Sequence, residues 1–175
     1  WIGLVGSEMC IRDRFSSDPL IAKDVEKFFT FVTGYAKPSK LNKIILSPIN
    51  SRLFLEKQID NEISNSLKGK DAEIWAKMNS LVDPQIIKKF YEASCKGVKI
   101  KLSVRGVCCL RPGVKGLSEN IEVKSIIGRF LEHSRIYCFA NGSPMPSRQN
   151  LVYIGSADLM PRTVSYTHLT LPTNA

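Results

Sequence analysis

The sequence predicts an α/β fold in which helices flank a partly parallel sheet. Short apolar runs with the periodicity of strands recur along the chain, and the first of them alternate with segments of helical spacing. Asp-Pro pairs also mark the starts of two of these helical segments. Strands that alternate with helices are typical of sheets with parallel strands.

The first expected helix begins at Asp18 and Pro19, an N-cap residue followed by a proline suited to the first turn. Gly34 ends it, and its apolar stripe comprises Ile21, Val25, Phe28, Phe29 and Val32. Residues 35–42 read as a linker. We expect a short buried strand over Lys43–Ser47 (KIILS) to follow.

A second helix is expected after a cap at Asn50 or Ser51, with an end at Gly69. Apolar residues repeat within it at i+4 spacing, at Leu55, Ile59, Ile63 and Leu67. A strand over Ala72–Met78 follows. The third helix begins at Asp83-Pro84 and ends at Gly97, and its buried face comprises Ile86, Ile87, Phe90 and Tyr91.

Residues Val98–Val104 alternate cleanly between apolar and polar side chains, which predicts a strand with one buried face. Arg135–Phe139 and Leu151–Gly155 are also strand-like. The segments Arg111–Asn120 and Gly142–Asn150 contain glycine or proline among polar residues and are expected to be loops.

Composition narrows the functional classes. The chain has 175 residues and a formal net charge of +9, which favours anionic partners such as nucleic acid, phosphorylated ligands or polyphosphate. No apolar run approaches the roughly 18 residues that span a membrane, and no signal-peptide pattern opens the sequence. The cysteines (Cys10, Cys95, Cys108, Cys109 and Cys138) form no C-x-x-C pair, so we expect reduced, buried thiols and no metal site.

Arg105 and Gly106 stand where the alternating strand ends, the edge at which open α/β sheets bind ligands. The planar guanidinium of Arg105 suits phosphate oxygens, and Gly106 permits a close approach of the backbone to a ligand. A solvated arginine at a strand end is the alternative interpretation of this pair.

The second candidate is His133, which lies between Arg129 and Arg135. It can donate a hydrogen bond to a phosphate or take up a proton, or it can simply be hydrogen-bonded at a strand start. Nine basic and three acidic residues lie between Lys96 and Arg135, so positive charge surrounds both candidates.

Several long motifs resemble one family. The segments VRGVCCLRPGVKGLSENIEVKSIIGRFLEHSRIYCFANG, VYIGSADLMPR, LSPINSR and KMNSLVDP are similar to the C-terminal part of bacterial polyphosphate kinase, whose catalytic domains are related in fold to phospholipase D. Within SADLMPRT, Leu159 stands where that family usually has tryptophan, and Thr163 where it has asparagine.

The resemblance implies a phospholipase-D-like mixed sheet flanked by helices and truncated at its C-terminal side. It assigns 15–39 to the end of a first catalytic domain and 40–163 to most of a second. Residues 1–14 and 164–175 resemble translated sequencing-adaptor sequence and are expected to lie outside the fold.

By the same resemblance, the family transfers the terminal phosphate of ATP reversibly to polyphosphate, with Mg²⁺, through a phosphohistidine. That histidine and the Mg²⁺ ligands are expected outside this chain, so the chain alone is expected to be inactive. Arg105 of the VRG motif is expected to contact nucleotide phosphates, and His133 of the FLEHSRI motif to contact them and act as a second catalytic histidine. ATP/ADP and polyphosphate are the expected partners, with no nucleic acid, in a cytoplasmic homo-oligomer whose association with the inner face of the membrane is left open.

Two rival functions stay open. Phospholipase-D-type phosphodiesterases use H-x-K-x-x-x-x-D, but here Arg135 and Ala140 occupy the lysine and aspartate positions after His133. A non-catalytic module that binds polyanions or nucleic acid is compatible with the net charge.

Overall fold

The computed structural model describes residues 16–34, 40–47, 49–129 and 133–161, which form two compact units, 1–46 and 47–175. The expected adaptor-like tails, residues 35–39 of the expected linker, Cys10 and Thr163 lie outside the described residues.

The first unit contains α2 (Pro19–Val32), which begins where the sequence predicts. The Asp18 carboxylate caps it by accepting the Leu20 N–H at 2.8 Å, and Gly34 follows its end with φ of 81°. The apolar stripe is largely exposed, since Phe29 and Val32 each retain 61% of their accessible surface.

The strand expected over Lys43–Ser47 is wrong, because this segment is irregular and only partly buried. Asp24 explains the difference: its carboxylate accepts the backbone N–H groups of Asn42, Lys43 and Ile44 at 2.8, 2.6 and 3.1 Å. These donors are therefore used by a side chain of α2. Burial opposes ionisation of Asp24, but these hydrogen bonds lower its pKa to about 2.

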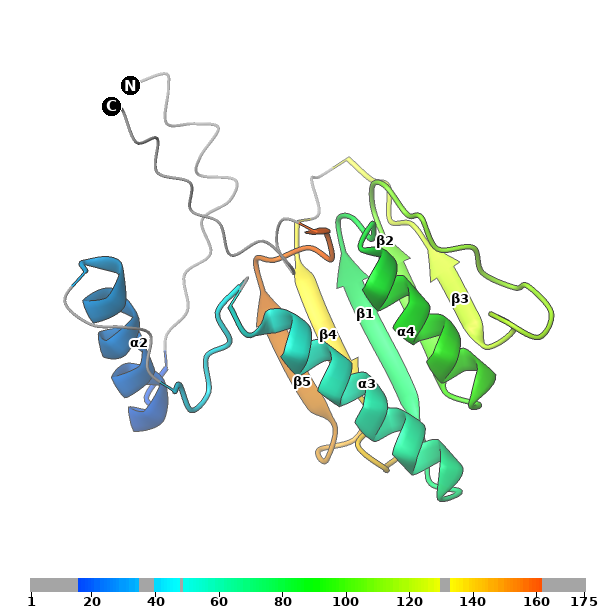
Figure 1. Ribbon diagram of the computed structural model, residues 1–175, viewed down its shortest axis with the longest axis horizontal. Coiled ribbons are helices and arrows are strands. Elements are labelled where there is room, and N and C mark those ends of the chain that lie inside the picture. Colours follow the sequence, from blue (N-terminus) through cyan, green and yellow to red (C-terminus); the bar gives the residue numbers. More distant parts are fainter. Residues whose placement is uncertain (1–15, 35–39, 48, 130–132, 162–175) are drawn as a thin grey trace. The chain divides into compact units, whose positions relative to one another are not determined.

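The second unit is built on a five-stranded sheet in the order β3-β2-β1-β4-β5 (Figure 1). The strands are β1 (Glu73–Met78), β2 (Lys99–Val104), β3 (Ile121–Lys124), β4 (Arg135–Phe139) and β5 (Leu151–Gly155). The first three are parallel, whereas β4 is antiparallel to β1 and to β5. The predicted partly parallel sheet is confirmed, but the sequence analysis missed β3.

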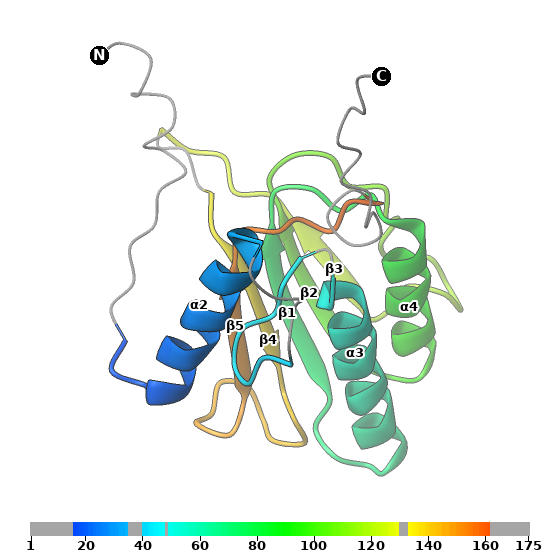
Figure 2. The same ribbon diagram turned by 60° about the vertical axis from the view of Figure 1, so that its left-hand side comes forward.

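Helices α3 (Ser51–Leu67) and α4 (Pro84–Cys95) pack side by side on one face of this sheet (Figures 1 and 2). Asn50 is the N-cap of α3 without a side-chain hydrogen bond, and the Asp83 carboxylate caps α4 by accepting the Gln85 and Ile86 N–H groups. The predicted boundaries of both helices are confirmed to within a residue or two.

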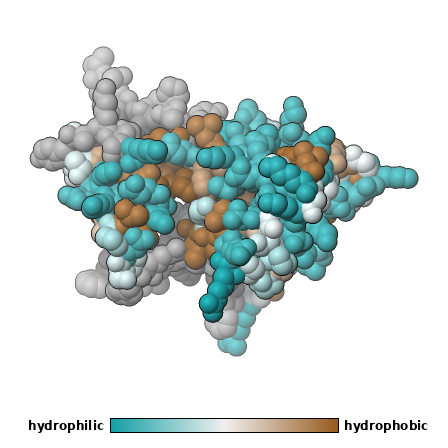
Figure 3. Space-filling model, turned by 90° about the horizontal axis from the view of Figure 1, so that it is seen from below, coloured by the Kyte–Doolittle hydropathy of each residue, from teal (hydrophilic) through white to brown (hydrophobic). Residues whose placement is uncertain are grey.

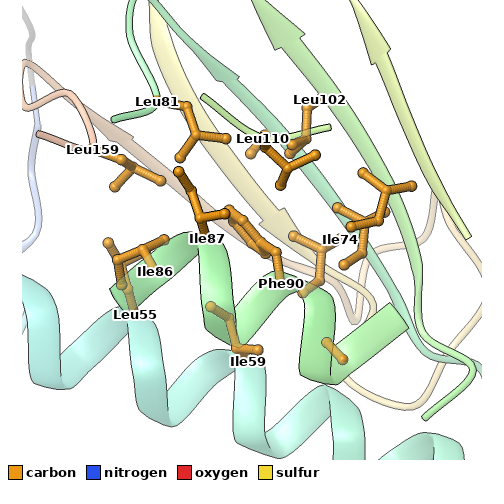
Figure 4. Close-up of a cluster of buried hydrophobic side chains, with 14 of the residues drawn as sticks. Leu55, Ile59, Ile74, Leu81, Ile86, Ile87, Phe90, Leu102, Leu110 and Leu159 are labelled. Carbon is orange, nitrogen blue, oxygen red and sulfur yellow. The ribbon is translucent and has the colours of Figure 1, made fainter. Parts of the chain in front are cut away.

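The core lies between these helices and the sheet. Figure 4 shows Leu55 and Ile59 of α3 gathered with Ile86, Ile87 and Phe90 of α4 against Ile74, Leu102 and neighbouring loop residues. Each such side chain contributes about 1.5–3 kcal/mol when fully buried. The side chain of Leu159, which replaces the tryptophan usual in the resembling family, is 2% exposed within this core.

Leu67, the last residue of the i+4 series in α3, is 68% exposed because it lies in the final turn of the helix. The predicted burial of the cysteines is wrong. The described cysteines are free, as expected, but Cys95 and Cys109 are exposed and Cys108 and Cys138 only partly buried. Cys95 and Cys109 lie where the helix ends and in a loop after β2, outside the packed layers.

Candidate functional site

The candidate site lies at one edge of the sheet, where β1, β2 and β3 end (Figure 1). Because β4 is antiparallel to β1, the start of β4 lies at this edge too, and the end of β5 returns to it. The loops after β1, β2 and β5 and the residues before β4 therefore meet here. In open α/β sheets this carboxyl edge is the usual place for a ligand.

Arg105 and Gly106 follow β2 directly, as predicted. The Arg105 N–H donates to the Met78 carbonyl at 3.2 Å, and the Gly106 N–H donates to the Asn79 carbonyl at 2.8 Å. A Cβ at Gly106 would lie 3.0 Å from that carbonyl oxygen. The close approach observed at Gly106 is therefore to the end of β1, and the approach of its backbone to a ligand stays a prediction.

His133 lies two residues before β4 and is partly buried. Its ring Nδ1 is 3.0 Å from the side-chain Nδ2 of Asn79. The two predicted site residues are thus brought to the same segment: Asn79 holds the backbone after Arg105 with its carbonyl and the ring of His133 with its side chain. Phe130, Leu131 and Glu132 of the predicted motif lie outside the described residues.

An ion pair between the buried Arg135 and the partly buried Asp158 supports this arrangement. The Arg135 guanidinium donates to both carboxylate oxygens of Asp158, at 3.2 and 2.9 Å, and to the His133 carbonyl at 2.9 Å. Asp158 also accepts the N–H groups of Asn79 at 2.8 Å and Ser80 at 3.3 Å. Burial alone would raise the pKa of Asp158, but Arg135 and these N–H groups hold that pKa below its ordinary value.

Sequence reasoning missed Asn79 and Asp158 as site residues, although both belong to quoted motifs. The available signal was positional: Asn79 directly follows β1, and Asp158 lies three residues after the end of β5. Polar residues just beyond strand ends are candidates at such an edge.

Residues 111–120, predicted as a loop between the two candidates, contain no helix or strand, as expected. Ser118 organises its turn, since its buried hydroxyl accepts the Val114 N–H at 2.9 Å and donates to the Arg111 carbonyl at 2.8 Å.

A metal centre finds no support in the described part of the chain. No three His, Cys, Asp or Glu side chains come together there. The partly buried carboxylate of Asp158 at the candidate site is already bonded to a guanidinium and two amides. The described residues therefore do not fit a Mg²⁺ ion.

The opposite edge of the sheet offers a polar hollow of about 320 Å³, lined in part by Lys70, Asp71, Lys99 and Ser143. Figure 3 views the molecule from that side, and the described surface there is mostly hydrophilic with a few apolar patches. This hollow contains neither predicted site residue, and its lining includes both Lys and acidic side chains. Among the described residues, no helix combines the length and apolar character needed to cross a membrane.

Comparisons with known proteins agree with one another. The family model described as Polyphosphate kinase C-terminal domain 2 matches residues 44–167. The chain is 56% identical over 150 residues to a polyphosphate kinase of Erythrobacter litoralis, covering 86% of this chain and 21% of that protein. It is 47% identical over 161 residues to a polyphosphate kinase of Dictyostelium discoideum, covering 91% of this chain and 14% of that protein.

The crystal structure of polyphosphate kinase from Porphyromonas gingivalis is also similar, with a TM-score of 0.79 and 36% identity over 85% of this chain and 22% of that chain. This likeness confirms the expected phospholipase-D-like fold, a mixed sheet with helices. The chain spans about a fifth of the length of the Erythrobacter relative.

Proposed function

The chain belongs to the polyphosphate kinase C-terminal domain 2 family, and from this we propose that it is the part of a polyphosphate kinase that holds phosphates at the carboxyl edge of its sheet. The reaction is the reversible transfer of the terminal phosphoryl group of ATP to polyphosphate. ATP, ADP and inorganic polyphosphate are its small-molecule partners.

One observation carries the proposal: Asn79 holds Gly106, the residue after Arg105, with its carbonyl and His133 with its side chain, at the end of β1, where such sheets bind ligands. Arg105 supplies a planar fork that matches two phosphate oxygens, and His133 supplies a ring N–H. A phosphoryl group in transfer spreads negative charge over its oxygens, and fixed donors of this kind stabilise that charge.

The rest of the reaction is assigned to the longer enzyme. The phosphohistidine nucleophile and the Mg²⁺ ligands lie outside this chain, and the chain contributes phosphate binding and the second histidine. We assign 15–39 to the end of the first catalytic domain and 40–163 to the second. We also place the enzyme in the cytoplasm as a homo-oligomer, and the free thiols of the described cysteines favour a reducing compartment.

The phosphodiesterase alternative is disfavoured by two residues. Arg135 stands at the lysine position of H-x-K-x-x-x-x-D, but its guanidinium is buried against Asp158. Ala140 stands at the aspartate position, has no ionisable group and is fully buried. Neither side chain can therefore do what that mechanism requires of it.

The test uses the Erythrobacter litoralis polyphosphate kinase with its matching region replaced by this chain. In this chimera, Arg105→Lys keeps the charge but loses the bidentate fork. We expect a loss of about 2–4 kcal/mol of transition-state stabilisation, a rate of ATP-dependent polyphosphate growth lower by about 30- to 1000-fold. His133→Ala should also disable turnover.

Arg111→Lys is the matched control, because Arg111 is an exposed arginine in the neighbouring loop, and it should keep the parent rate. A folded Arg105→Lys chimera that runs at the parent rate would reduce Arg105 to a solvated strand end. The 175-residue chain alone should show no polyphosphate growth above blank, and sustained growth would contradict the division of labour proposed here.

A further inference from the structure

Asn79 is unusual in that its three polar groups face three different loops. Its N–H donates to Asp158 at 2.8 Å, its carbonyl accepts from Gly106 at 2.8 Å, and its side-chain Nδ2 lies 3.0 Å from Nδ1 of His133. The residue is buried, with 7% of its surface exposed. The backbone of Asn79 is therefore held by hydrogen bonds at both its N–H and its carbonyl. These bonds fix the position from which its side chain contacts His133.

The donor and the acceptor in the contact between Asn79 and His133 follow from the chemistry of the two groups. A carboxamide nitrogen has hydrogens to donate and no lone pair to accept with, so Nδ1 of the ring must be the acceptor. In a neutral imidazole that accepts at Nδ1, the single ring hydrogen is on Nε2. An imidazolium would place an Nδ1–H against the amide NH₂ and would force Asn79 to turn its amide over.

We propose that Asn79 is a positioning residue that holds His133 as the neutral tautomer with its hydrogen on Nε2. This inference rests on the proposed phosphate site, because it leaves Nε2–H as the donor to a phosphate oxygen. The ring then gives one hydrogen bond to developing negative charge and stays uncharged at the resting state. Asn79 itself does not touch the phosphate.

The other charged groups at this edge of the sheet have partners or positions of their own. Arg135 of β4 binds the carbonyl of His133 and is neutralised by Asp158 after β5. Arg105 follows β2 at the same edge of the sheet. The side chain of Asn79 lies within hydrogen-bond distance of a ring nitrogen of His133, at 3.0 Å.

The chain is well suited to a direct test, because it has two histidines, His133 and His168. In the chain with His168→Ala, ¹⁵N-labelled histidine leaves one ring to observe by NMR. We expect the Nε2–H tautomer in this parent and a mixture of tautomers in Asn79→Ala. Asn79→Asp puts an accepting carboxylate at Nδ1, so we expect the hydrogen there and protonation of the ring at higher pH.

Asn61→Asp is the matched control, because it makes the same change in charge on the exposed side of α3 and should leave the ring unchanged. Backbone amide spectra show whether each variant is folded, and Asn79→Ser gives a second small substitution if Asn79→Ala is not. An unchanged tautomer in folded Asn79→Ala or Asn79→Asp would overturn the inference.

Activity separates this inference from the proposed function. In the chimeric kinase, Asn79→Ala should lower kcat by about 10- to 100-fold, by analogy with the loss of a partner that orients a metal-bound histidine. Asn79→Asp should shift the pH profile of kcat toward higher pH. If the tautomer follows Asn79 while His133→Ala keeps full activity, the proposed function fails and the positioning role stands; if His133→Ala is inactive while the tautomer ignores Asn79, the reverse holds.

Discussion

Each end of β1 is held by a carboxylate, the buried Glu62 at the start and the partly buried Asp158 at the end, and the two carboxylates differ in their partners. At the start of the strand, Glu62 of α3 accepts the N–H groups of Glu73 at 3.2 Å and Asn141 at 2.7 Å. At the end, Asp158 accepts two N–H groups and also pairs with Arg135. Both therefore join a distant loop to the central strand.

The difference appears in their ionisation. Burial raises the pKa of Glu62, and its two backbone donors only partly oppose this. Burial acts in the same direction on Asp158, but the guanidinium of Arg135 and the N–H groups outweigh it, so its pKa is lowered. The end of the strand that carries the candidate site thus has a fixed charge pair, whereas the other end has a carboxylate that folding favours in its protonated form.

The largest expected effect comes from removing the Arg135–Asp158 ion pair at the end of β1. Asp158→Ala leaves Arg135 buried without its partner, and the loss of one member of a buried pair costs about 3–5 kcal/mol. Urea unfolding of the chain measures this cost. Asp158→Asn, which keeps the shape and one acceptor, should recover part of it. A loss of less than about 1 kcal/mol in Asp158→Ala, the value of an exposed pair, would contradict the structural role given to this pair.

A smaller effect is expected where β1 touches the loop after β2. Gly106→Ala places a Cβ 3.0 Å from the Asn79 carbonyl, so backbone must shift, at a cost of about 1–3 kcal/mol. Gly128→Ala is the matched control, because a Cβ there meets nothing within 4 Å. Thermal unfolding should separate the two variants, and equal melting temperatures would show that this contact does not constrain the site.

The smallest effect concerns pH at the other end. Because the pKa of Glu62 is raised on folding, its contribution to stability is present at low pH and is lost as pH rises through its folded-state pKa. Asp158 behaves oppositely: its pKa is lowered from 3.8, so its contribution is present above that value and is lost as pH falls through the folded-state pKa.

Glu62→Gln should remove the first of these slopes, so the stability of the variant relative to the parent should rise as pH increases from 4.5. Glu56→Gln, partly exposed on the same helix, is the control and should follow the parent. Urea unfolding over a pH series measures both. A difference between Glu62→Gln and parent that stays constant with pH would contradict the raised pKa.

Local signals explain how much of the fold could be predicted. The Asp-Pro helix starts and the alternation in β2 are encoded within a few residues, and both were predicted with nearly correct boundaries. The four-residue β3 was missed because IEVK is too short to show a period. The KIILS strand was predicted from its apolar residues. Nothing in the local sequence indicated that the Asp24 carboxylate would accept the backbone N–H groups of Lys43 and Ile44.

The site residues also separate into those that local sequence predicts and those that only the folded topology reveals. Arg105 could be proposed because it ends a recognisable strand, and His133 because of its charged neighbours. Asn79 and Asp158 could not, since their hydrogen bond joins residues 79 positions apart and exists only because β5 returns to the edge where β1 ends. The topology of a mixed sheet, rather than any motif, brings them together.

The central claim is that phosphates bind beside Arg105 and His133, at the edge of the sheet where β1 and β2 end. It is tested most directly by titrating the ¹⁵N-labelled chain with polyphosphate at low salt. The account predicts amide shifts at Asn79, Gly106 and the residues beside His133, with binding that weakens steeply as salt is added. Shifts centred on the opposite edge, at Asn141 and the hollow lined by Lys70 and Lys99, would contradict it.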